Sequence, residues 1–136
     1  MADVTITPSA VVKSSTTTQL PSNVTWGEAV DAGEWVYLDS ATATYKLADN
    51  TTAIKANVAG MALTSGATGQ PGVVAKGNPV TLENMTTGKV YYLSANPGKM
   101  CPEADLGSGA YVTALGGATS ATGFIISLLA TGVAVP

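Results

Sequence analysis

Residues 33–40, Gly-Glu-Trp-Val-Tyr-Leu-Asp-Ser, are typical of a turn that leads into a β-strand. The aromatic side chains of Trp35 and Tyr37 would share one face of this strand. Val36 and Leu38 would share the other face, because successive side chains of a strand point in opposite directions. A strand that is apolar at both parities is expected to be buried on both faces. We therefore expect this strand to lie at the centre of the fold.

Residues 88–95, Gly-Lys-Val-Tyr-Tyr-Leu-Ser-Ala, repeat the pattern at an offset of 88 − 33 = 55 residues. We interpret the offset as a duplicated β unit, with repeats at approximately 28–80 and 83–135. Such a duplication favours a small barrel or sandwich, since two half-sheets can close one core. Identical residues at the same offset are Glu28 and Glu83, Gly77 and Gly132, and Val80 and Val135.

Helix-forming patterns are poor throughout the chain, which is dominated by the weak helix formers Thr, Val and Gly. We expect an all-β fold with under ~10% helix. Residues 23–136 are expected to form a single β domain, preceded by an extended N-terminal arm at 1–22. Turns are predicted at Gly77-Asn78-Pro79 and Thr131-Gly132. Further strands are expected at 24–26, 45–47, 58–64, 73–75, 80–82, 111–115, 124–129 and 133–135.

The N-terminal arm alternates with period 2 at Val4-Thr5-Ile6-Thr7, and Pro8 ends that run. No tight-turn dipeptide joins the parts of the arm into a hairpin. Its apolar side chains must be buried either on its own domain or on a neighbouring subunit, and the sequence leaves both alternatives open. The residues that we predict to contact a partner protein or subunit are Val4, Ile6, Val11, Val12 and Trp26.

Charge is sparse in this chain of 136 residues, which has the length of one domain. Charged residues make up 11%, against about 25% in ordinary globular proteins. The six cations are all lysines, scattered singly, and the net charge is −3. Nucleic-acid binding requires a clustered positive surface, so we expect no nucleic-acid partner. The low charge suggests a surface of small polar residues or one covered by a partner chain.

Residues that carry catalysis or bind metals are rare. The chain has no His and no Arg, so a Ser-His-Asp or Cys-His arrangement cannot be built. Cys101 is the only cysteine, which excludes an intrachain disulfide, and we expect it to be a small buried apolar residue. Asp49-Asn50 and the acids near Glu103 do not form an EF-hand pattern, and we interpret both as solvated loops. We predict a protein that is not an enzyme, with no cofactor and no metal.

The N-terminus, Met1-Ala2-Asp3-Val4, has neither the basic nor the apolar region of a signal peptide. The most apolar run, at 124–130, is too short to span a bilayer. We therefore expect synthesis in a cytoplasm and no membrane partner.

The order of several motifs resembles that of small proteins encoded among the head genes of tailed bacteriophages, the capsid decoration or cement proteins. The resemblance implies a β-rich protein on the outer surface of the virion capsid, often a homotrimer, that binds the major capsid protein and stabilises the shell. It would be synthesised in the bacterial host cytoplasm, and no catalytic residue is carried over. The motifs are the Val-Thr-Ile-Thr opening, residues 31–40, Lys46-Leu47-Ala48-Asp49, Gly60-Met61-Ala62-Leu63, Gly69-Gln70-Pro71, residues 88–94 and Val133-Ala134-Val135-Pro136.

Two alternative functions remain open. The first is another structural part of a virion, such as a head-fibre base, a tail component or a connector component. The second is a carbohydrate-binding β module that uses Trp26 or Trp35 as a platform for a sugar ring.

Overall fold

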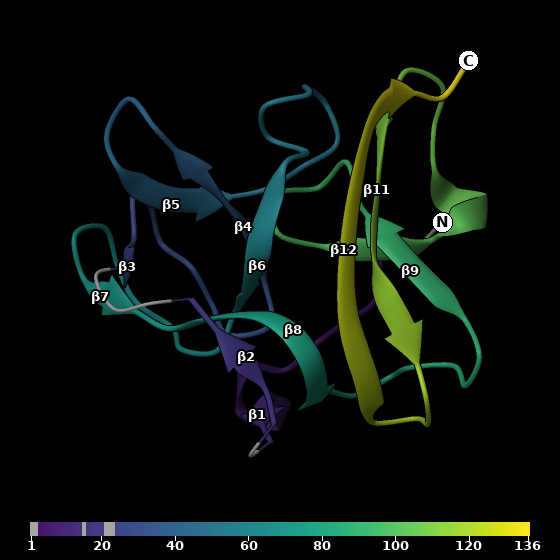
Figure 1. Ribbon diagram of the computed structural model, residues 1–136, viewed down its shortest axis with the longest axis horizontal. Helices are drawn as coiled ribbons and strands as arrows, with labels where there is room; N and C mark the ends of the chain where they lie inside the picture. The colour runs from purple at the N-terminus through teal and green to yellow at the C-terminus, as the bar shows by residue number, and fades with distance from the viewer. Residues whose placement is uncertain (1–2, 15, 21–23) are drawn as a thin grey trace.

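The computed structural model describes residues 3–14, 16–20 and 24–136. It contains 46% strand and 5% helix, so the predicted all-β fold is confirmed. A ten-stranded sheet curls into a half-barrel, and a second sheet contains only β3 and β7 (Figure 1). The elements are η1 (Pro8–Ala10), β1 (Val12–Lys13), β2 (Thr18–Gln19), β3 (Val24–Thr25), β4 (Trp35–Asp39), β5 (Thr44–Leu47), β6 (Val58–Ala62), β7 (Pro71–Gly72), β8 (Val74–Thr81), β9 (Val90–Leu93), β10 (Met100–Pro102), η2 (Glu103–Asp105), β11 (Tyr111–Ala118) and β12 (Gly123–Ala134).

The large sheet is built from two similar units. In the first unit the strands lie in the order β5-β4-β6-β8, and in the second unit they lie in the order β10-β9-β11-β12. The last strands of the two units, β8 and β12, pair antiparallel and join the units into one sheet. The two strands that suggested the duplication, β4 and β9, therefore hold equivalent places in the topology.

Local irregularities are repeated as well. The register between β4 and β6 shifts between Val36 and Tyr37, and the register between β9 and β11 shifts between Tyr91 and Tyr92, 55 residues later. Such shifts mark β-bulges, which bend and twist a strand at a defined point. The glycine that precedes each strand also has a positive φ, 94° at Gly33 and 80° at Gly88.

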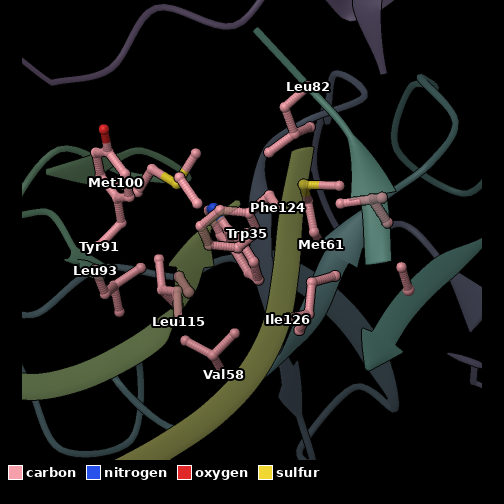
Figure 2. Packing of buried hydrophobic residues seen from close by; sticks show 14 of the residues in the cluster. Trp35, Val58, Met61, Leu82, Tyr91, Leu93, Met100, Leu115, Phe124 and Ile126 are labelled. Atoms are coloured by element: carbon pink, nitrogen blue, oxygen red, sulfur yellow. The ribbon is translucent and has the colours of Figure 1, made fainter. Parts of the chain in front are cut away.

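The two units share one core. Trp35 of β4 is fully buried and meets the edge of Phe124 of β12, with ring centroids 6.1 Å apart and an interplanar angle of 65° (Figure 2). Tyr91 of β9 packs on the same Phe124 ring from the second unit. Val36 points to the other side of β4, into a smaller cluster that contains Trp26 and Val74. The strand is thus buried on both faces over its first three residues, as predicted.

The expectation of burial is wrong for Leu38, the last apolar residue of β4. Its side chain is exposed, because β4 runs out beyond the core at this end of the sheet. It lines a groove between the two units.

Both predicted turns near the ends of the repeats are wrong, since they are kinks within continuous strands. Residues 77–79 lie inside β8, where Asn78 has a φ of 68° and the strand continues. Thr131 and Gly132 lie inside β12, where Gly132 has a φ of 69° and the Thr131 hydroxyl donates to the Val112 carbonyl at 2.8 Å. A single residue with positive φ produces a bulge, and the strand continues because the residues on either side still pair with the neighbouring strands.

The glycine and valine pairs at the ends of the repeats are not structural equivalents. The equivalent positions in the last strands are Ala75 and Ile125, which are related by 125 − 75 = 50 residues. The offset falls because the loop before β12 is shorter than the segment between β6 and β8, which includes β7.

Candidate interaction surfaces

The first described residues lie on the chain's own second unit. The backbone N–H of Val4 donates to the Met100 carbonyl at 2.9 Å. The Asp3 carboxylate accepts from the Ser94 hydroxyl at 2.5 Å and from the Asn96 amide at 2.6 Å. These contacts fix the start of the arm across β9 and β10.

The arm then continues along its own domain. The backbone N–H of Thr7 donates to the Glu83 carboxylate, and its hydrogen bonds lower the pKa of Glu83. Further on, β1 and β2 pair antiparallel with β8, in registers that include Val12 with Thr81. The strand with which the arm pairs therefore belongs to the same chain. The first of the two open alternatives is therefore the one in the structure.

The predicted interface residues fall into three environments. Val4, Ile6 and Val11 are half-buried against the main core. Val12 is 53% exposed on β1 and has free surface for a partner. Trp26 is fully buried, which corrects its assignment to an interface.

Trp26 is enclosed because two glycines lie against its ring. A Cβ at Gly72 would come within 2.1 Å of the indole, and one at Gly66 would come within 2.7 Å. Trp35 is also fully buried. Neither indole is available to a sugar ring, so the carbohydrate platform predicted as an alternative is wrong for both residues.

A groove that the sequence did not reveal opens between the two units. It has a volume of about 800 Å³ and is lined by residues of β4, β6, β11 and β12 together with Ser40, Ala53, Ile54, Ala56 and Asn57, and none of these described lining residues is charged. Ile54, which is 74% exposed, lies at the rim of this groove, and the exposed Leu38 lines it as well. An isolated isoleucine within a polar segment, Asp49 to Lys55, is the sequence signal that points to this surface.

The loop predicted to be solvated at Asp49 and Asn50 is buried, which corrects that interpretation. The Asn50 side-chain amide donates to the Leu93 carbonyl at 2.9 Å and so ties the first unit to the second. Asp49 accepts from the N–H of Thr51 at 3.0 Å and lies 3.9 Å from the ammonium of Lys55. These partners satisfy buried polar groups that would otherwise be costly.

The described residues contain no group of three or more His, Cys, Asp or Glu side chains that could hold a metal ion. Cys101 is buried, as predicted. Burial raises the pKa of its thiol to about 11, with a smaller contribution from the charges of Asp3 and Asp105. Within the part of the chain that the structure describes, no helix is long and apolar enough to cross a membrane.

Neither the models of protein families nor the curated proteins contain a match to this chain.

Proposed function

We propose that this protein is a capsid decoration protein of a tailed bacteriophage, which binds the outer surface of the shell and stabilises it. The resemblance in motif order supports this function. The observation that carries the proposal is the uncharged groove with Ile54 at its rim, because apolar surface gathered around a hollow is typical of protein–protein contact sites. The major capsid protein is the proposed partner.

Stabilisation would follow from mass action. A protein that binds only the assembled shell stabilises that state by its binding free energy at each site. Transferring an exposed side chain such as Ile54 from water into a contact is worth on the order of 1.5–3 kcal/mol, less the cost of ordering the groups involved. Modest affinity per copy therefore suffices when many copies act on one shell.

The homotrimer implied by the resemblance is part of the proposal. Several copies held together would present several grooves to the capsid at once, which raises the effective concentration of each binding event.

Electron microscopy of virions that carry a labelled copy of this protein tests the location. We expect label over the outer face of the head. Label confined to the tail or to the connector would contradict the proposal and favour the alternative virion part.

A further inference from the structure

Residues from three neighbouring strands of the first unit form a row across the sheet. Trp35 of β4 pairs with Met61 of β6, and Met61 pairs with Ala75 of β8. All three side chains are fully buried in the main core. The second unit supplies what covers them, with Phe124 edge-on against Trp35.

The equivalent row of the second unit is open to solvent. Val90 of β9 pairs with Gly117 of β11, and Gly117 pairs with Ile125 of β12. Val90 is 47% exposed and Ile125 is 44% exposed. The same position in the duplicated topology is thus an interior row in one unit and a surface row in the other.

A second row lies beside it and has the same character. Tyr92 pairs with Ala114, and Ala114 pairs with Leu129, which is 62% exposed. The alternate residues Tyr91 and Phe124 point the other way into the core, so both rows lie on the outer face of the sheet. We call this surface the open face, formed by Val90, Tyr92, Ala114, Gly117, Ile125 and Leu129.

We propose that the open face is the contact between copies of this chain. The inference deepens the proposed function, which requires several copies acting together. In the first unit, the equivalent row of Trp35, Met61 and Ala75 is already buried, and the second unit of the same chain covers it. The open face bears no charged side chain, so a second copy can bury it without desolvating an unpaired charge. Interfaces between identical subunits have apolar centres of this kind.

Charge complementarity at the rim also favours a second copy. Lys89 and Glu103 border one hollow together with Val90 and Tyr92. Both are exposed, and neither belongs to an ion pair within the described residues. When copies meet through this face, Lys89 of one copy can lie against Glu103 of the next, and closed symmetry repeats that pair at every contact.

Sedimentation equilibrium of the purified protein over a range of concentrations tests the assignment. We expect the wild type to associate, and Leu129→Lys to raise the dissociation constant at least about tenfold, as expected when one well-buried apolar anchor is lost. Ile54→Lys is the matched control, because this exposed residue lies at the groove instead of the open face. A wild type that stays monomeric, or equal association by all three proteins, overturns the inference.

A charge exchange tests the rim pair. Lys89→Glu and Glu103→Lys are each expected to weaken association several-fold, and the double variant is expected to restore it. If the losses of association in the two single variants simply add in the double variant, Lys89 and Glu103 do not pair across the contact.

Cross-linking detects the contact between copies directly, without relying on variants that weaken association. Cys101 is buried, so Leu129→Cys creates an accessible thiol on the open face. A short bis-maleimide is expected to link copies of Leu129→Cys and to leave Ile54→Cys unlinked at the same protein concentration. The reverse pattern overturns the inference.

Capsid binding, measured separately, distinguishes this inference from the proposed function. Protein that associates through the open face but leaves purified capsids bare contradicts the function and supports the inference. Monomeric wild type whose capsid binding is lost in Leu129→Lys assigns the open face to the capsid and overturns the inference.

Discussion

Trp35 and Val90 hold equivalent positions in the two units, yet Trp35 is fully buried and Val90 is 47% exposed. The two units have the same strand order, but they are covered differently. The first unit is covered on both faces, by the second unit and by the small β3–β7 region. The second unit is covered on its inner face and leaves its outer face to solvent.

Substitution at these two positions should have unequal effects. Trp35→Ala removes a large buried ring that contacts Phe124, and we expect it to lower the free energy of unfolding by about 3–5 kcal/mol. Val90→Ala should cost about 1 kcal/mol or less, because much of that side chain is already in water. Urea denaturation of the three proteins at low concentration measures both differences. Equal losses would contradict the asymmetry between the units.

The two turn glycines provide a second matched comparison. Alanine at Gly33 or at Gly88 must adopt a positive φ, at a cost of about 1–2 kcal/mol. At Gly33 the added Cβ would also lie 2.7 Å from Cγ2 of Ile6, whereas at Gly88 it would meet open space. We expect Gly33→Ala to be the more destabilising of the two in thermal denaturation.

A double-mutant cycle assigns that difference to the arm. In the background of Ile6→Ala, the extra cost of Gly33→Ala should shrink, because the crowding atom has been removed. An extra cost that is unchanged in this background would show that the arm does not lie over Gly33.

Removal of residues 1–13 should lower the melting temperature of the domain. Val4 and Ile6 are half-buried against the main core, and the arm makes hydrogen bonds to Met100 and Asn96. Circular dichroism should show a folded β protein with an earlier transition. A truncated protein with the melting temperature of the full chain would contradict the docking of the arm on its own domain.

The buried thiol of Cys101 should react with a thiol reagent only as the protein opens. Its pKa is raised to about 11, so at pH 8 the folded protein holds it as the neutral, unreactive thiol. In the unfolded chain the thiol has its ordinary pKa of 9.0. Between that pH and about 11 unfolding therefore releases a proton, and this group's contribution to stability falls as pH rises. The measurement is the labelling rate with and without urea. Immediate stoichiometric labelling in native buffer would contradict the burial.

The sequence predicted those features of the fold that depend on residues close together in the chain. The apolar parities of Trp35 and Val36 predicted a strand buried on both faces, and the spacing of Gly33 and Gly88 predicted two similar units. Both properties follow from backbone periodicity and turn chemistry, which act over a few residues. The small count of helix-forming patterns predicted the β class for the same reason.

The remaining features depend on contacts between distant residues. Asn50 can be buried because its side-chain amide donates a hydrogen bond to the Leu93 carbonyl. No residue near Asn50 in the sequence indicates that partner. Asn78 has the chemistry of a turn residue, but pairing on both sides of β8 continues the strand through it. The sequence alone allows Trp26 to lie at the surface, and only the packing of Gly66 and Gly72 against its ring explains why it is buried. The groove at Ile54 exists only once the two units are assembled.

The most direct test of the proposed function is a binding isotherm on purified, expanded phage capsids that lack this protein. We expect saturable binding by the wild type and at least about tenfold weaker binding by Ile54→Lys, since a charge at the groove rim must be desolvated on contact. Val73→Lys is the matched control, an exposed apolar position outside the groove, and should bind like the wild type. Capsids left bare by the folded wild type, or bound equally well by Ile54→Lys, would contradict the proposed function.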